Sequence, residues 1–159
     1  MGSRLRINLA YIAGFLDGDG SLMLQVKKRK DTKRGFRFMA TIAFYQDSCH
    51  ESPLYWIREV FGIGYISRRK DGITELRING FQQILEILVL LQPYIRFKQD
   101  QVCVLIKACD MLSCKKINEL NKKELVFLVD CVLSVKNANY KSNSSHTKET
   151  LYSIIGLTP

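Results

Sequence analysis

The fold of this chain is decided by the stretch Tyr11-Ile12-Ala13-Gly14-Phe15-Leu16-Asp17-Gly18-Asp19-Gly20-Ser21. Its first half is apolar on nearly every side of a helix, so we expect a helix that is buried all round. Ala10, Gly14 and Gly18 recur at four-residue spacing and therefore form one stripe along that helix. Because glycine costs about 1 kcal/mol in a helix interior relative to alanine, the stripe predicts close approach of another backbone.

Two carboxylates and two glycines end this helix, at Asp17-Gly18-Asp19-Gly20. The C-terminal end of a helix carries partial negative charge, so acids placed there need a compensating cation. A divalent metal such as Mg²⁺, which prefers oxygen ligands, would supply it. Asp-Gly pairs also form ordinary turns, so these four residues alone leave both interpretations open. An EF-hand loop is excluded, because Leu22 and Lys28 stand where it requires glycine and glutamate.

The 159 residues suffice for one domain over residues 1–159, with a core over 1–135 and a polar loop and short C-terminal helix over 136–159. Charges interrupt every apolar run before membrane-spanning length, and we expect neither a signal peptide nor a membrane segment. Five cysteines without a CxxC pair favour free thiols over a disulfide framework. Cys49-His50 lacks a partner pair at zinc-ligand spacing, so we expect no zinc site.

Positive charge is concentrated in one segment of the chain. The formal net charge is +9, and residues 27–37 carry seven basic residues and one acid, a net of +6. A solvated loop can also be rich in lysine, but clustered charge is typical of proteins that bind a polyanion such as nucleic acid. The strands predicted on both sides of the segment favour the polyanion.

Alternation of polar and apolar residues predicts two β-hairpins. Residues 21–29 and 36–46 would pair through the basic connection, and residues 65–69 and 73–79 would pair around a glycine-containing turn. A helical period predicts further helices over residues 52–61, 81–91, 98–112, 119–135 and 151–155.

The predicted sheet has one apolar face for the helices and one polar face that combines arginine, lysine, glutamine, serine and glutamate. Such a face suits the major groove of DNA, which is about 12 Å wide and offers both donors and acceptors. Every antiparallel sheet can have one wet face. The basic charge and the mixture of donor types here favour nucleic acid.

The run from Ile12 to Gly20 closely resembles the signature of the LAGLIDADG homing endonucleases. The predicted order of elements is similar to the αββαββα core of that family over essentially the whole chain. The resemblance implies an α+β fold in which a saddle-shaped antiparallel sheet carries helices on one face. The motif occurs once, as is typical of the homodimeric branch, so the resemblance also implies a homodimer.

The family's activity implies a site-specific endonuclease that cuts double-stranded DNA at a long, roughly palindromic target and leaves 3′ overhangs. The implied cofactor is Mg²⁺, with Mn²⁺ as a substitute, and no small-molecule cofactor or membrane partner is implied. Relatives with one motif are usually encoded within introns of chloroplasts or mitochondria, which implies an organelle as the location.

The same resemblance assigns a catalytic set to positions near the end of the motif helix. Asp19 would bind the metal together with the backbone carbonyl of Gly18. Gln46, at the end of the second strand, would position a water, and Lys98 would stabilise charge on the phosphate. His50 stands where relatives often carry arginine, and its role stays open.

Two further surfaces follow from the resemblance. Asp17 is interpreted as structural at the helix end and, with Ala10, Ala13 and Gly14, as part of the dimer interface. The side chains expected to contact DNA are Gln25, Lys27, Arg29, Arg37, Tyr45, Ser67, Arg69, Glu75 and Arg77, with Lys141 in a tail loop. A slip of one residue would turn each strand position to the other face of the sheet.

Two alternatives remain open from the sequence. Some LAGLIDADG relatives do not cut DNA and act as RNA maturases or DNA-binding regulators. A generic basic DNA-binding protein would not need the Asp17-Gly18-Asp19-Gly20 run at all. The joint presence of Asp19, Gln46 and Lys98 favours the endonuclease.

Overall fold

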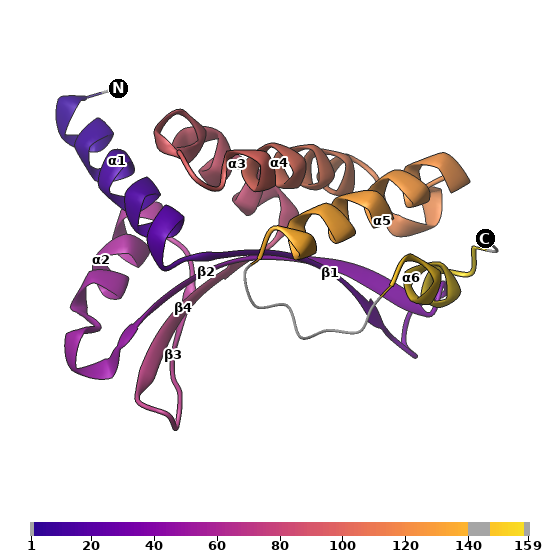
Figure 1. Ribbon diagram of the computed structural model, residues 1–159, viewed down its shortest axis with the longest axis horizontal. Coiled ribbons are helices and arrows are strands. Elements are labelled where there is room, and N and C mark those ends of the chain that lie inside the picture. Colours follow the sequence, from indigo (N-terminus) through magenta and orange to yellow (C-terminus); the bar gives the residue numbers. More distant parts are fainter. Residues whose placement is uncertain (1, 140–146, 158–159) are drawn as a thin grey trace.

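The computed structural model describes residues 2–139 and 147–157, whose arrangement is drawn in Figure 1. The helices and strands are α1 (Ser3–Gly18), β1 (Ser21–Lys28), β2 (Phe36–Asp47), α2 (Ser52–Phe61), β3 (Tyr65–Arg68), β4 (Ile73–Asn79), α3 (Phe81–Leu91), α4 (Gln99–Cys114), α5 (Lys122–Asn137) and α6 (Lys148–Ile155). This order confirms the predicted α+β class and the αββαββα succession.

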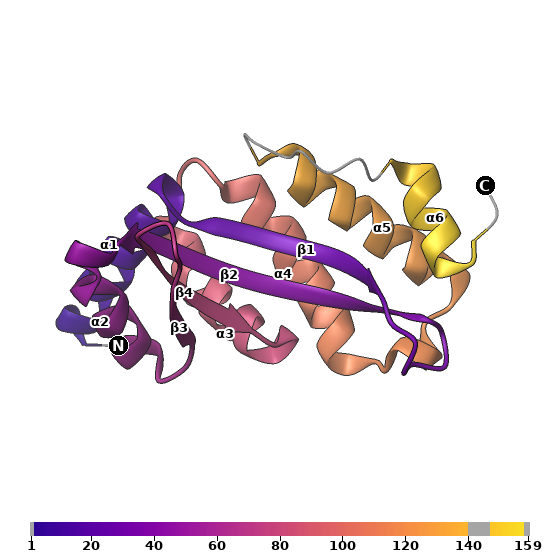
Figure 2. The same cartoon turned by 90° about the horizontal axis from the view of Figure 1, so that it is seen from below.

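The described residues form one antiparallel sheet of four strands in the order β1-β2-β4-β3. The sheet curves beneath the helices, which lie on one of its faces (Figure 1), and the opposite face is open to view from below (Figure 2). The two hairpins meet through β2 and β4, where Tyr45 pairs with Glu75, and Glu75 in turn pairs with Ser67 on β3. The two predicted hairpins, β1–β2 and β3–β4, are therefore present.

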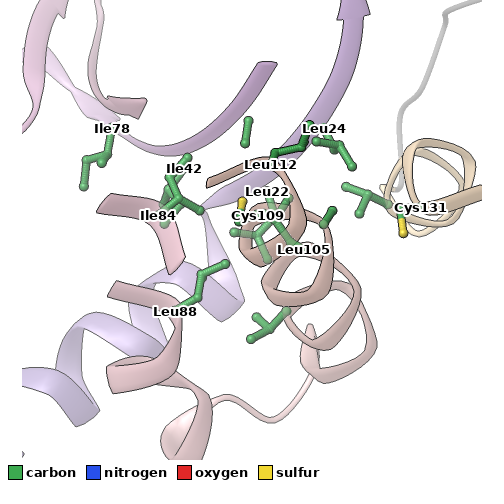
Figure 3. Close-up of a cluster of buried hydrophobic side chains, with 14 of the residues drawn as sticks. Leu22, Leu24, Ile42, Ile78, Ile84, Leu88, Leu105, Cys109, Leu112 and Cys131 are labelled. Atoms are coloured by element: carbon green, nitrogen blue, oxygen red, sulfur yellow. The ribbon is translucent and has the colours of Figure 1, made fainter. Parts of the chain in front are cut away.

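The core lies between the sheet and the helices. Leu22, Leu24 and Val26 are buried on β1, and the residues between them are only partly buried, as the alternation predicts. Figure 3 shows the core side chains of the sheet facing those of the helices, among them Ile42, Ile84, Leu88, Leu105, Cys109 and Leu112. Burial raises the pKa of the Cys109 thiol to about 12, and all five cysteines, each within the described residues, are free thiols.

Helix α1 differs from prediction, because it is buried on one side only. Leu9, Ile12 and Leu16 pack into the core, whereas Ile7 and Tyr11 keep 66% and 62% of their surface exposed. The expectation of burial on all sides is therefore wrong for the single chain. A sequence pattern reports that a side chain is apolar, but it cannot report whether the same chain covers it.

The C-terminal segment also differs in its bounds from the predicted loop over residues 136–150. Helix α5 continues to Asn137, and α6 begins at Lys148, where the Thr147 hydroxyl caps the helix by accepting from the backbone N–H of Thr150 at 3.3 Å. Asn139 fastens the end of α5 to β1 through a hydrogen bond from its side-chain nitrogen to the carbonyl of Leu22, 3.2 Å away. Across the described residues, no helix combines the length and the apolar character that a membrane crossing requires.

Candidate active site and nucleic-acid interface

Asp19 stands at the C-terminal end of α1, where its backbone N–H donates to the carbonyl of Phe15 at 3.0 Å. The residue is exposed, and its carboxylate receives no hydrogen bond from the described part of the chain. The carbonyl of Gly18, in the same helix turn, likewise has no hydrogen-bond donor among the described residues. Two adjacent oxygen groups at the negative end of the helix dipole form a site that favours a cation.

Gly20 allows the sharp exit from α1 into β1. A Cβ at this position would lie 2.5 Å from the Cδ1 of Leu16, and 2.8 Å and 2.9 Å from the Cα and carbonyl oxygen of that residue. Backbone atoms cannot move aside as a flexible side chain can. Glycine is therefore required at the residue that follows Asp19.

Asp17 has a different environment from Asp19, since it is only 8% exposed. Its Oδ2 accepts from the backbone N–H groups of Arg96 at 2.5 Å and Phe97 at 3.2 Å, and its Oδ1 accepts from that of Lys98 at 3.0 Å. The carboxylate thereby fastens the α3–α4 connection to the end of α1. Its three hydrogen bonds lie within the chain, which agrees with a structural role, and the buried side chain exposes little surface for the predicted dimer contact.

Lys98 reaches back over the same helix end. Its Nζ donates to the carbonyl of Leu16 at 2.9 Å and to the carbonyl of Asp17. Burial lowers the pKa of Lys98, and the nearby charges of Asp17 and Asp19 oppose that shift. The structure therefore brings the predicted lysine next to the predicted metal-binding acid.

Asp19 and Lys98 line a cleft that also includes Asp17 and Gly18, and Gln46 lies near this cleft without lining it. Because Ser21 pairs with Ala43, Asp19 and Gln46 both lie just beyond the same end of the β1–β2 pair. Among the described residues, those that line the cleft include Asp19 and Lys98 but not Gln46. The Oε1 of Gln46 accepts from the backbone N–H of the next residue at 2.9 Å, which turns the amide oxygen toward its own strand end.

The register places most of the predicted DNA-binding positions on the sheet face that turns away from the helices. On the β1–β2 pair, Gln25 lies opposite Met39 and Lys27 lies opposite Arg37. On the other strands, Arg77 of β4 lies between Ala43 and Tyr65, and Glu75 lies between Tyr45 and Ser67. Arg29 and Arg69 follow the last residues of β1 and β3. Figure 2 shows the sheet from this side. Lys141 lies outside the described residues.

Glu75 does not fit its predicted contact with a base. Its side chain is only 6% exposed and accepts a hydrogen bond from the Nε of Arg77, whose side chain remains 48% exposed. One carboxylate oxygen is hydrogen-bonded to Arg77, and the side chain exposes little surface to a nucleotide in this conformation. Its observed effect is to orient Arg77.

A network that the sequence did not reveal supports the segment after β2. The Glu51 carboxylate accepts from the Nε of Arg68 at 2.9 Å and from the hydroxyl of Thr74 at 2.6 Å. The Arg68 and Thr74 hydrogen bonds lower the pKa of Glu51 to about 2. The backbone N–H of Ser48 also donates to the carbonyl of Gly72 at 2.8 Å. No local motif signals these contacts, because they depend on the β3–β4 turn reaching across to this segment.

An exposed stripe follows the outer side of α1. Ala10, Gly14 and Gly18 are exposed, and a Cβ built on either glycine would have no atom within 4 Å. None of the described residues therefore requires glycine at positions 14 and 18. Ala13, by contrast, is fully buried in the core, so its assignment to the dimer interface is wrong. The helical period turns position 13 inward while it turns position 14 outward.

An apolar hollow borders this stripe between α1 and α2. It is lined by Ile7, Tyr11, Pro53 and Trp56, together with two polar residues. The rings of Tyr11 and Trp56 meet edge to face, with centroids 5.6 Å apart. Phe97, on the connection that Asp17 fastens to α1, keeps 86% of its surface exposed. Apolar residues grouped on one surface in this way are typical of a contact with another molecule.

Residues 12–95, more than half of the chain, match the family model described as LAGLIDADG endonuclease. The chain belongs to the LAGLIDADG endonuclease family. It is 25% identical over 139 residues to DNA endonuclease I-CreI of Chlamydomonas reinhardtii, an alignment that covers 87% of this chain and 85% of the relative.

Solved structures of LAGLIDADG endonucleases share the fold. The homing endonuclease I-CvuI, known from Chlorella vulgaris, was solved with the I-CreI target in 2 mM Mg with its DNA not cleaved. It superposes with a TM-score of 0.83 at 21% identity, over 98% of this chain and 96% of that chain. I-SmaMI bound to cleaved DNA gives a TM-score of 0.74 at 24% identity, over 96% of this chain but 50% of that one.

Proposed function

We propose that this LAGLIDADG protein is a site-specific homing endonuclease. It would act as a homodimer with Mg²⁺, cut double-stranded DNA at a long, roughly palindromic target and leave 3′ overhangs. The observation that carries the proposal is the exposed Asp19 carboxylate, which has no hydrogen bond from the described residues and lies next to Lys98. Membership of an endonuclease family supports phosphodiester hydrolysis as the reaction.

The oxygens at the end of α1 fit a divalent metal. Asp19 would hold it through its carboxylate and Gly18 through its backbone carbonyl, and oxygen ligands are those that Mg²⁺ and Mn²⁺ prefer. The described residues contain no group of three or more His, Cys, Asp or Glu side chains that could hold a metal. This suits Mg²⁺, which keeps several waters and binds through one or two carboxylates together with phosphates.

The residues around this site have separable roles in the proposed reaction. Bound Mg²⁺ would supply Lewis-acid polarisation of the scissile phosphate. The Lys98 ammonium, held against the carbonyls of Leu16 and Asp17, would place positive charge where the phosphate gains negative charge. Gln46, at the same end of the sheet, would hydrogen-bond a water or the DNA after its amide turns away from its own strand.

The outer stripe of α1 supports a homodimer. The open space over Gly14 and Gly18 would admit a second backbone, and Ile7 and Tyr11 would lose their exposed apolar surface on association. The match to half of the I-SmaMI chain agrees with an assembly built from two such units. A symmetric dimer places the same surface on both subunits, which predicts two-fold symmetry in the target.

The open face of the sheet would carry the DNA. Its arginine, lysine and glutamine side chains can form paired hydrogen bonds with base edges in the major groove. The exposed lysines near the β1–β2 turn would contact phosphates, so affinity should fall as salt concentration rises. For location we propose a chloroplast or mitochondrion, on the support of similarity to proteins of Chlamydomonas reinhardtii and Chlorella vulgaris.

A pooled library of target duplexes, incubated with the purified protein in Mg²⁺, tests the proposal. The expected result is cleavage of one roughly palindromic site with 3′ overhangs, by a species that sediments as a dimer. If the protein binds one site but cuts nothing in Mg²⁺ or Mn²⁺, the endonuclease proposal fails and a non-cutting maturase or regulator replaces it. Chelation of the metal should stop cleavage and leave binding to the target measurable.

A further inference from the structure

The turn between β1 and β2 contains an arginine that contacts the protein itself. The Nη2 of Arg34 donates to the carbonyl of Asn118 at 3.0 Å and to the carbonyl of Leu120 at 2.9 Å. These residues lie in the connection between α4 and α5, more than eighty positions later in the chain. Figure 2 shows the end of the hairpin reaching this connection.

The connection that receives Arg34 is itself well fixed. Leu120 is 2% exposed and belongs to the core. Asn121 caps α5 by accepting from the backbone N–H of Glu124 at 3.0 Å, while the Glu124 carboxylate accepts from the backbone N–H of Asn121 at 2.9 Å. The carbonyls of Asn118 and Leu120, which accept from Arg34, therefore belong to a well-ordered part of the chain.

The turn is also ordered by contacts of its own. The backbone N–H of Arg29 donates to the carbonyl of Gly35 at 2.8 Å, and the Thr32 hydroxyl donates to the carbonyl of Phe36 at 3.2 Å. Gly35 has a φ of 73°, a conformation that glycine adopts readily. The Arg29 guanidinium pairs with Asp31 at 3.0 Å. These contacts hold the shape of the turn, and Arg34 sets its position against the helices.

The lysines of residues 27–37 differ from Arg34 in their contacts. Lys27, Lys28, Lys30 and Lys33 are exposed, and no described residue forms an ion pair or hydrogen bond with their ammonium groups. Arg34 is partly buried, and its guanidinium is directed at two carbonyls of the protein. The four lysines, not Arg34, have the free charge that phosphates attract.

The turn lies far from the proposed cutting centre. From Asp19 to the end of β1 the strand extends about 25–30 Å, at roughly 3.3 Å per residue. At 3.4 Å per base pair this corresponds to about seven to nine base pairs from the centre of the target. The tip of the hairpin would therefore face the outermost base pairs of each half-site.

We propose that Arg34 is a positioning residue for recognition of these outer base pairs. By holding the hairpin tip against the α4–α5 connection, it fixes where Arg29 and the four lysines meet the DNA, and it does not itself contact a phosphate. The inference rests on the proposed function, because it assumes that the open face of the sheet binds a specific target.

The matched variants Arg34→Ala and Lys33→Ala remove one positive charge each from the same turn. Affinity is measured at several salt concentrations for the full target and for duplexes in which single base pairs, inner or outer, are exchanged. The wild type should reject each outer exchange at least about fivefold. Arg34→Ala should lose most of that discrimination, keep discrimination at inner positions and kcat on saturating target, and keep the wild-type slope of log affinity against log salt.

Lys33→Ala should show the opposite result, with outer discrimination kept and the salt slope reduced by about one. Arg34→Lys keeps the charge but loses the planar guanidinium, so it should resemble Arg34→Ala in discrimination, and thermal unfolding identifies any variant that fails to fold. The inference is overturned if Arg34→Ala reduces the salt slope as Lys33→Ala does, or if it leaves outer discrimination intact. A wild type that selects no site at all would instead contradict the proposed function.

Discussion

Asp17 and Asp19 lie two residues apart at the same end of α1, yet their environments are opposite. The carboxylate of Asp17 is buried and accepts three backbone hydrogen bonds, whereas that of Asp19 is exposed and receives none from the described residues. A helix turns about 100° per residue, so residues two apart point to different sides. One motif can thus carry one acid that maintains the structure and a second that is free for chemistry.

The largest expected effect is that of Asp19→Asn on cleavage. The substitution removes the negative charge that would hold the metal, and metal catalysis supplies several kcal/mol of transition-state stabilisation. We expect the cleavage rate to fall by about a thousandfold or more, since each 1.4 kcal/mol is a factor of ten. Thermal unfolding and target binding should stay close to wild type, because the Asp19 carboxylate makes no hydrogen bond with the described residues. Single-turnover cleavage assays measure the cleavage rate, and fluorescence titrations measure binding to the target.

Asp17→Asn should affect stability where Asp19→Asn does not. An amide offers one acceptor oxygen in place of the two that now receive the N–H groups of Arg96, Phe97 and Lys98. We expect the free energy of unfolding to fall by about 2–4 kcal/mol, since a lost bond to a charged group leaves a buried donor unsatisfied. Urea unfolding measures this. If Asp17→Asn abolished cleavage at unchanged stability, the roles assigned to the two acids would have to be exchanged.

The sequence predicted parts of this comparison and missed others for physical reasons. Alternation and helical period depend on neighbouring residues, so strand faces such as Leu22 and Leu24 were predictable. The donors to Asp17 lie 79 to 81 residues away, and no local spacing indicates them. Glu75 is buried on a strand that lies between Tyr45 and Ser67 of its two neighbours, and the exposure of Tyr11 depends on which surfaces one chain covers.

Gly14, exposed on α1, and Gly20, buried just after it, should respond in opposite ways to an added methyl group. Gly20→Ala should lower the free energy of unfolding by about 1–3 kcal/mol, because its Cβ would clash with the backbone of Leu16. Gly14→Ala should raise the stability of the single subunit by about 0.5–1 kcal/mol, since alanine favours a helix and the space is open. Urea unfolding of dilute protein compares them.

The same Gly14→Ala variant tests the dimer. A methyl group on the proposed contact surface should weaken association, so sedimentation at graded concentrations should show a higher dissociation constant than that of the wild type. An unchanged dimer would place the subunit contact away from Gly14 and would leave the exposed α1 stripe to another partner.

The smallest expected effect concerns the proton on Lys98, whose Nζ donates to the carbonyls of Leu16 and Asp17 at the end of α1. Burial lowers its pKa below the ordinary value of 10.5, so between the two values the unfolded chain binds more protons than the folded chain. The contribution of Lys98 to the free energy of unfolding should therefore rise with pH through that window and be least favourable below it.

The difference in unfolding free energy between wild type and Lys98→Met, followed by urea titration, should increase toward pH 10.5. Lys107→Met, at an exposed lysine of α4, should give a flat difference. A difference that decreases with pH would mean that attraction to Asp17 and Asp19 outweighs burial, and the lysine would then belong with the exposed acid as a charged partner.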